Sequence, residues 1–369
     1  MNSPIDLLKR SLEYRLAAMT ALDGVSGQEQ EVVAYLRSEL APLADEVRVD
    51  RMGNVYATLH GRGLGPHLML EAHSDEIGAM VKSIAPDGFL RILGVGGISP
   101  AMLVGRNVRV CGHHGVIGVK SGHLQSPEER RRVLEVHELY VDVGADSADQ
   151  VAALGIRIGD AVAYDSPLAA FANADRVSGK AIDNRIGCAV LLEVLRELDH
   201  AAPAGTLSVV ICVQEEVALR GAQVAAYSVQ PDYAIAVDTF MSGDTPDVDY
   251  YRELPAAIGH GPVLLLANSA HFGHPAVNRY VRKAAEVAGV SLQESLVGQG
   301  MAATDAGAIH LSRSGVPTAG LSLARRYSHT PVCTLDLNDG ADAVRLLTAF
   351  VQHMGDHTDL GFLPTGPSA

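Results

Sequence analysis

A strongly apolar segment that leads directly into two acidic residues constrains this chain more than any other feature. Residues 207–213 read LSVVICV, which is too continuously apolar for a strand with one face in water. The segment therefore predicts a central strand of a sheet that is covered on both faces. Glu215 and Glu216 follow it, and buried carboxylates destabilise a fold unless they are paired, protonated or bound to a metal ion. Either a divalent cation neutralises the pair, or the strand ends at Gln214 and both acids lie in water.

The composition excludes several classes of protein. The chain carries 29 Lys and Arg against 43 Asp and Glu, a net charge of −14, which argues against a nucleic-acid or anionic-membrane partner. No apolar run reaches the roughly 18–20 residues that a membrane span needs, and no secretion signal opens the chain. We therefore expect a cytoplasmic protein with no membrane partner. The four cysteines form no Cys-x-x-Cys pair, so we expect reduced thiols and neither a disulfide nor a thiolate metal site.

The order of the predicted elements divides the chain into an α/β domain and an insertion. Residues 1–76 and 166–369 alternate strands with helices, the pattern of an α/β domain. Residues 77–165 instead show short apolar stretches between turns, which predict a small β-barrel or sandwich. The predicted α/β helices are 3–22, one after a cap near Ser26, 183–198, 218–228, 275–288, 306–312 and 339–353, and the strands are 47–50, 54–59, 67–73, 207–213, 232–237, 292–296 and 317–323.

Side chains that commonly bind metals follow the buried strands or begin a helix. In open α/β sheets, sites form beyond the carboxyl ends of the strands. The candidates are His73, Asp75, Asp183, Glu215, Glu216, Asp238 and His329. Each has an ordinary alternative, such as a solvated turn for His73 or a helix N-cap for Asp183. Together they form the nitrogen and oxygen set that suits zinc, cobalt or manganese, and a shared carboxylate would hold two ions about 3.5–4 Å apart.

Other polar motifs are weaker candidates. His271 and His274 either line a substrate pocket or lie in solvent. Asp305 either caps a helix or supports the site. Residues 94–97, GVGG, resemble half of a phosphate loop but lack its Lys and its strand–helix context, so we reject that interpretation. The chain contains no Gly-x-Ser-x-Gly motif, which argues against a serine hydrolase.

Six short motifs, in this order along the chain, carry a resemblance to a known family. They are HSDEIG (73–78), AIDNR (181–185), VQEE (213–216) with LRGA (219–222), AVD (236–238), ATDAG (303–307) and RYSH (326–329). In order and spacing they resemble the tetrahedral aminopeptidase and glutamyl aminopeptidase family of dinuclear metallopeptidases, over nearly the whole chain. One departure is Ala324, near which a Pro would be expected, and it affects only the shape of the local loop.

The resemblance implies a role for each candidate residue. Two divalent ions, zinc or cobalt, would be held by His73, Asp238, Glu216 and His329, with Asp183 as the bridge. Glu215 would be the general base, and Asp75 would orient His73. The resemblance also implies a mixed-sheet phosphorylase/hydrolase-like domain. Its inserted β-barrel or PDZ-like domain would form dimers, which assemble into a homododecamer.

The resulting prediction is a metal-dependent aminopeptidase that removes N-terminal residues from short peptides. One alternative is a related dinuclear hydrolase that acts on blocked or acylated peptides or amino acids with the same residues. A second is an inactive metal-binding scaffold, which is disfavoured because no predicted ligand is replaced.

Overall fold

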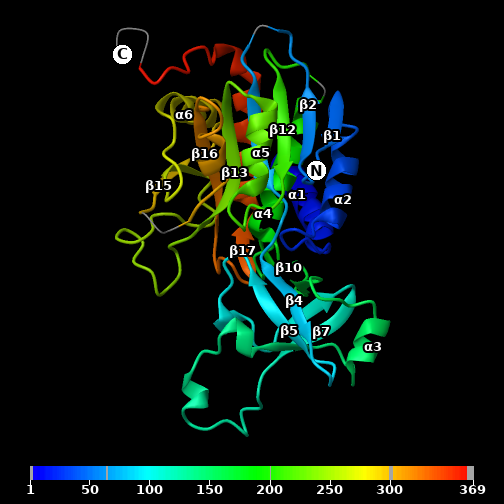
Figure 1. Ribbon diagram of the computed structural model, residues 1–369. Coiled ribbons are helices and arrows are strands. Elements are labelled where there is room, and N and C mark those ends of the chain that lie inside the picture. The colour runs from blue at the N-terminus through cyan, green and yellow to red at the C-terminus, as the bar shows by residue number, and fades with distance from the viewer. Residues whose placement is uncertain (1–2, 64, 200, 299–301, 364–369) are drawn as a thin grey trace.

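A mixed eight-stranded sheet forms the centre of the α/β part of the chain (Figure 1). The structure is a computed structural model that describes residues 3–63, 65–199, 201–298 and 302–363. The strand order is β1-β2-β12-β3-β13-β16-β14-β15. These strands are β1 (Glu46–Val49), β2 (Val55–Leu59), β3 (Leu68–His73), β12 (Leu207–Cys212), β13 (Tyr233–Met241), β14 (Val263–Ala267), β15 (Gln293–Leu296) and β16 (Thr318–Arg325).

The four central strands, β12, β3, β13 and β16, are parallel neighbours. Their carboxyl ends therefore lie at one edge of the sheet, where side chains from distant parts of the sequence can meet. Every residue of β12 is buried, which confirms the predicted central strand. The strands β2 and β14, which flank this group, run antiparallel to it.

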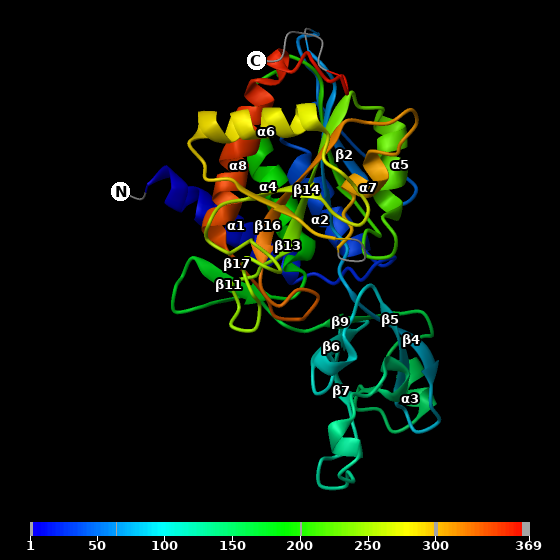
Figure 2. The same cartoon turned by 90° about the vertical axis from the view of Figure 1, so that its left-hand side faces the viewer.

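Helices cover both faces of the sheet (Figure 2). One face packs against α1, α2, α4, α6 and α8, and the other against α5 and α7. The helices are α1 (Pro4–Thr20), α2 (Gln30–Leu40), α4 (Ile182–Leu198), α5 (Arg220–Val229), α6 (Pro275–Ala288), α7 (Ala306–Ile309) and α8 (Leu337–Gln352), followed by the 3-10 helix η4 (Met354–Asp356). Within the described ranges, none of the helices combines the length and apolar character needed to cross a membrane.

A closed barrel with its own apolar core follows the end of β3 (Figure 1). Its order is β4-β5-β8-β7-β6-β9, and the last of these strands leads back toward the α/β part. The elements are β4 (Gly78–Ile84), β5 (Leu90–Val95), η1 (Pro100–Met102), β6 (Asn107–Val110), β7 (His113–Gly118), η2 (Glu129–Arg131), η3 (Val136–Glu138), β8 (Tyr140–Asp142), α3 (Ala148–Ala153) and β9 (Ala161–Tyr164). A second, three-stranded sheet has the order β10 (Ala169–Ala170), β11 (Arg176–Gly179) and β17 (Cys333–Asp336). In sequence, β11 comes shortly before α4, and β17 comes directly before α8.

The predicted fold class, an α/β mixed sheet with a small inserted barrel, is confirmed, and several element boundaries are corrected. The strand β13 continues to Met241, so Asp238 lies inside the strand and not at its end. The helix α7 ends at Ile309, three residues before the predicted end. Ser26 caps no helix, because α2 begins at Gln30 without a side-chain cap. The strands β10, β11, β14 and β17 had no counterpart among the predicted elements.

Candidate metal centre

The carboxyl edge of the parallel strands brings the predicted site residues together around a cavity of about 520 Å³. Five of them line this cavity: Asp183, Glu215, Glu216, Asp238 and His329. His73 and Asp75 are buried, with exposed fractions of 2% and 0%. The structure therefore shows the predicted convergence of these side chains.

The polar groups of the site form two sets of possible metal ligands, and Asp183 lies between them. Donor atoms of His73, Glu215 and Asp238 all lie within 4.8 Å of one another, and so do those of Asp183, Glu216 and His329. Asp183 faces both sets, because its Oδ1 is 3.5 Å from His73 Nε2 and its Oδ2 is 3.6 Å from His329 Nε2. A carboxylate with one oxygen toward each set has the geometry of a bridge between two cations.

Asp183 does not cap the helix that it begins. The N-cap of α4 is Ala181, whose side chain makes no cap hydrogen bond, and the backbone at Asp183 is not helical. The side chain that accepts a backbone N–H at this end of the helix is that of Asn184, whose Oδ1 accepts the N–H of Gly187 at 3.0 Å. The hydroxyl of Thr239 donates to Asp183 Oδ1 at 2.7 Å. The N-cap alternative is therefore wrong, and the carboxylate points into the site.

Asp75 connects the histidine of one strand to the two glutamates that follow another. Its Oδ1 lies 3.4 Å from His73 Nδ1 and accepts the backbone N–H of Glu215 at 2.9 Å. Its Oδ2 accepts the backbone N–H of Glu216 at 3.2 Å and the hydroxyl of Ser26 at 2.6 Å. Ser26, predicted as a helix cap, thus supports this buried carboxylate.

The backbone after β12 separates the two glutamate side chains. Gln214 has a φ of +57°, a left-handed conformation that turns the chain sharply. Glu29 holds this turn by accepting the Gln214 N–H at 3.1 Å. As a result Glu215 Oε2 lies 3.9 Å from His73 Nε2, whereas Glu216 Oε2 lies 3.5 Å from His329 Nε2.

His329 is positioned by a residue of the loop that follows β5 of the barrel. Its Nδ1 donates to the carbonyl oxygen of Gly97 at 2.9 Å, which leaves Nε2 as the nitrogen that faces Asp183 and Glu216. A Cβ at Gly97 would lie only 2.7 Å from His329 Nδ1. In the sequence, Gly97 is part of the segment 94–97 that is rejected as a phosphate loop. Its contact with His329 is not visible in the sequence, because it depends on how the barrel packs against the α/β part.

Arg325 is a buried cation inside the site that the sequence did not identify. A terminal nitrogen of its guanidinium lies 2.6 Å from Asp183 Oδ2, and the side chain lines the cavity. Its Nε has no hydrogen-bond partner among the described residues. The predicted strand ended at residue 323, but β16 continues to Arg325 and delivers this side chain to the site.

Buried basic residues also support the loop after β3. Lys180 Nζ donates to Glu76 Oε1 at 2.7 Å, and Arg185 Nε donates to the carbonyl oxygen of Ser74 at 2.5 Å. Lys180 and Arg185 are 1% and 0% exposed. These two residues lie on either side of Asp183 in sequence, so the same segment supplies the central carboxylate and fixes the loop that carries Asp75.

The site holds more negative than positive charge. Burial raises the pKa of Glu215 and Glu216 well above the ordinary value, and neighbouring carboxylates reinforce that rise. Burial also raises the pKa of Asp238. Burial opposes ionisation of Asp183 as well, but Arg325 and His73 outweigh it and lower the pKa. Divalent cations would offset this excess of acids, and the imidazole and carboxylate donors are the types that zinc or cobalt binds.

Two weaker candidates lie elsewhere. His271 is buried, and neither of its ring nitrogens has a hydrogen-bond partner among the described residues. Burial and the nearby His310 lower its pKa to about 4. Neither His271 nor His274 lines the cavity, so the structure supports neither a pocket role at this site nor solvent exposure of His271.

Comparison with known proteins identifies the family. The chain matches the M42 glutamyl aminopeptidase family over residues 53–346. It is 31% identical to a lysyl aminopeptidase of Pyrococcus furiosus over 338 residues, which cover 90% of this chain and 94% of the relative. It is 30% identical to a glutamyl aminopeptidase of Lactococcus lactis subsp. cremoris over 344 residues, which cover 91% and 95%.

Solved structures agree with this family. An aminopeptidase from the archaeon Desulfurococcus kamchatkensis superposes with a TM-score of 0.87 at 32% identity, covering 94% of this chain and 95% of that one. The TET1 peptidase of Pyrococcus horikoshii, which can assemble into a tetrahedron or a large octahedral shell, gives a TM-score of 0.81 at 31% identity, covering 92% and 99%. The chain belongs to the M42 glutamyl aminopeptidase family. It is therefore a hydrolase of the metal-dependent aminopeptidase class.

Substitution of Gly97 by Ala tests the contact between the barrel loop and His329. The added Cβ would collide with the imidazole, so we expect His329 to move and the affinity for a metal ion beside it to fall about 10- to 100-fold. Elemental analysis of protein dialysed at limiting zinc would show fewer ions per subunit.

Gly122→Ala is the matched control, because a Cβ at Gly122 meets no atom within 4 Å. This variant should retain the metal content of the unmodified protein. Equal metal content in both glycine variants would contradict the positioning role of Gly97.

Proposed function

We propose that this chain is a dinuclear aminopeptidase that removes N-terminal residues from short peptides. The observation that supports this proposal is the orientation of the Asp183 carboxylate. One of its oxygens faces His73, and the other faces His329. One ion would be held by His73, Asp238 and Asp183, and the other by Asp183, Glu216 and His329. Zinc or cobalt fits this mixture of imidazole and carboxylate ligands.

Glu215 is assigned as the general base. When bound, a pair of divalent ions activates a water molecule and polarises a peptide carbonyl. Glu215 accepts a proton from that water as its oxygen attacks the carbonyl carbon, and it returns the proton to the leaving nitrogen when the C–N bond breaks. Its Oε2 lies 3.9 Å from His73 Nε2, beside the first proposed ion, and its backbone N–H donates to Asp75. Asp75 orients His73 from the opposite side of the imidazole.

The cavity suits a small substrate. Its volume of about 520 Å³ accommodates a few amino-acid residues, and Leu219, Phe240 and Met241 give it apolar walls beside the acids. Two relatives are named for different residues, lysyl and glutamyl, and we expect the cavity walls, not the metal ligands, to set the preferred side chain. A hydrolase of blocked or acylated peptides would use the same centre and is the second candidate.

The barrel is assigned to subunit assembly. We infer that residues 77–165 form dimers that associate further into a homododecamer. Large apolar side chains on this part of the surface support the assignment, among them Leu124 at 71%, Ile158 at 67% and Val133 at 59% exposure. A related peptidase forms a tetrahedral or octahedral shell.

The activity itself is tested with the unmodified protein. Chelator-treated protein should be inactive, and zinc or cobalt should restore hydrolysis of aminoacyl reporters with a free α-amino group. Reporters with an acetylated amino group should be cleaved at a small fraction of that rate. Preferential cleavage of the acetylated reporters would favour the second candidate function, and no metal-dependent cleavage of either set would contradict both.

Paired substitutions at the adjacent glutamates separate the general base from the ligand. Glu215→Gln should retain both ions and lose at least about 100-fold in kcat, the contribution typical of general acid–base catalysis. Glu216→Gln should lose an ion, as elemental analysis would show. Full turnover in Glu215→Gln would exclude it as the base, and unchanged metal content in Glu216→Gln would exclude it as a ligand.

We expect Arg325 to lower the affinity for the second ion, the one assigned to Asp183, Glu216 and His329. Its guanidinium already contacts the oxygen of Asp183 that faces His329. Like charges about 4 Å apart in a site of intermediate dielectric repel by a few kcal/mol. We expect Arg325→Met to bind the second zinc ion about tenfold more tightly or better in a titration against a chelator.

Arg326→Met is the matched control, since Arg326 pairs with Asp244 at 2.6 Å and does not line the cavity. It should leave both zinc affinities unchanged. Weaker binding of the second ion by Arg325→Met would show that the guanidinium supports the site and does not compete with the metal.

A further inference from the structure

Glu71 places a carboxylate in an apolar layer of the fold. It lies within β3 and is 1% exposed. The residues beside it on the neighbouring strands are Val210 and Ala236, and both belong to the apolar cluster between the sheet and the helices α5 and α7. Met69, two residues earlier on the same face, belongs to that cluster too. A carboxylate here needs a partner.

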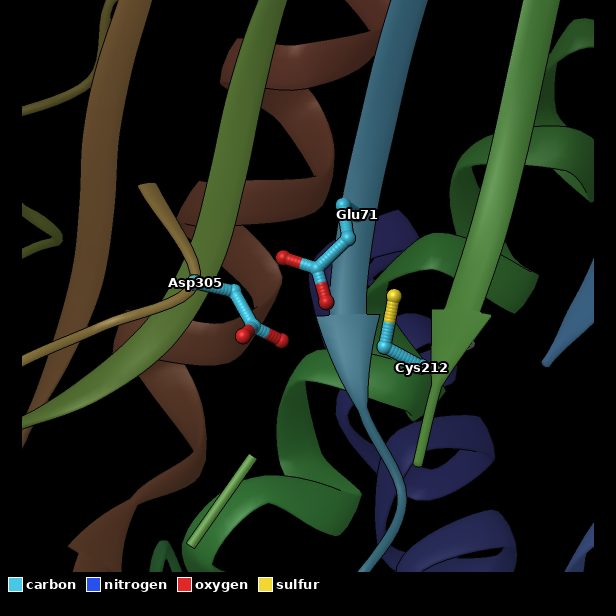
Figure 3. A group of neighbouring side chains, drawn as sticks. All are labelled: Glu71, Cys212 and Asp305. Atoms are coloured by element: carbon cyan, nitrogen blue, oxygen red, sulfur yellow. The ribbon is translucent and has the colours of Figure 1, made fainter. Parts of the chain in front are cut away.

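Two further side chains meet Glu71 in this layer, each from a different element. Figure 3 shows Glu71 between Cys212, at the end of β12, and Asp305, just before α7. One donor atom from each residue lies within 4.8 Å of the other two. Cys212 and Asp305 are 0% and 2% exposed, so all three groups are shielded from solvent.

Three of the four carboxylate oxygens in this cluster lack a hydrogen-bond partner in the part of the chain that the structure describes. Glu71 Oε1 and both carboxylate oxygens of Asp305 make no hydrogen bond to any described residue. Asp305 stands at the N-cap of α7 but makes no cap hydrogen bond, so the predicted capping role is wrong. No Lys, Arg or His within the described ranges forms an ion pair with Glu71 or Asp305. Two buried carboxyl groups facing each other must therefore share protons or bind a cation.

We propose that Glu71, Cys212 and Asp305 bind a third divalent cation of the zinc class, separate from the catalytic pair. A thiolate with two carboxylates is a donor set that zinc accepts, and Cys212 would release its proton to solvent on binding. Donor atoms around a tetrahedral zinc ion are about 3.4 Å apart, so small side-chain rotations from the present arrangement close the site.

The three ligands suggest a structural purpose and a route of entry. The ion would tie together β3, which carries His73, β12, which leads into Glu215 and Glu216, and the start of α7. Thr304, adjacent to Asp305, lines the catalytic cavity, so we expect the ion to enter from that side. This inference stands apart from the proposed function, because it needs no peptide substrate.

Cobalt substitution tests the site through its sulfur ligand. None of the residues proposed for the catalytic ions is a cysteine, so a thiolate-to-cobalt charge-transfer band in the near ultraviolet reports this cluster alone. The chelator-treated full-length protein, reloaded with cobalt, should show the band. Cys212→Ala should abolish it and bind one ion fewer per subunit, whereas the buried-thiol control Cys188→Ala should retain both the band and the ion.

Glu71→Gln keeps the shape of the side chain and provides a second variant if Cys212→Ala does not fold. It should weaken or abolish the band and lower the cobalt content by one ion per subunit. The absence of a band in the reloaded unmodified protein would overturn the proposal and leave shared protons as the explanation. So would equal cobalt content in the unmodified protein and Glu71→Gln. Hydrolytic activity enters neither readout, so failure here is distinguishable from failure of the proposed function.

Discussion

Carboxylates that converge near the carboxyl edge of the parallel strands, with too few cations to balance them, dominate the electrostatics of the site. Burial raises the pKa of Glu215, Glu216 and Asp238, so their ionised forms are unfavourable in the isolated chain. Such an arrangement persists only when something compensates for the charge. The metal ions that we propose would provide that compensation and catalytic chemistry together, which would explain why the acids are concentrated where the cavity opens.

The precision of the site comes from residues that contact the proposed ligands. Asp75 accepts the backbone N–H groups of Glu215 and Glu216, which follow β12. It also accepts the hydroxyl of Ser26 and faces His73 at the end of β3, so one carboxylate aligns the ends of two strands. Gly97 fixes His329 from the barrel side. The insertion therefore contributes to the geometry of the centre as well as to the proposed assembly, and a change in its docking would reach the metal ligands directly.

The sequence predicted the fold class and brought together the site candidates because long apolar runs mark buried strands, and polar residues after them meet at one edge. It misplaced Asp238, since β13 remains buried for several residues beyond its apolar run. It missed Arg325 because β16 extends past its predicted end, and it missed Gly97 because that contact joins two parts of the fold. In the sequence Glu71 is a single acid within a predicted strand, and the cysteines predict no thiolate metal site; only the folded positions of Cys212 and Asp305 bring a thiol and a second acid to Glu71.

We propose that Asp183 bridges two metal ions, and the other assignments at the site rest on this bridge. Its most direct test is X-ray diffraction from crystals of the zinc-loaded protein, with anomalous scattering to locate zinc. We expect two peaks about 3.5–4 Å apart on either side of the Asp183 carboxylate, one beside His73 and Asp238 and the other beside Glu216 and His329. A single peak in this region, or a pair of peaks that does not contact Asp183, would contradict it.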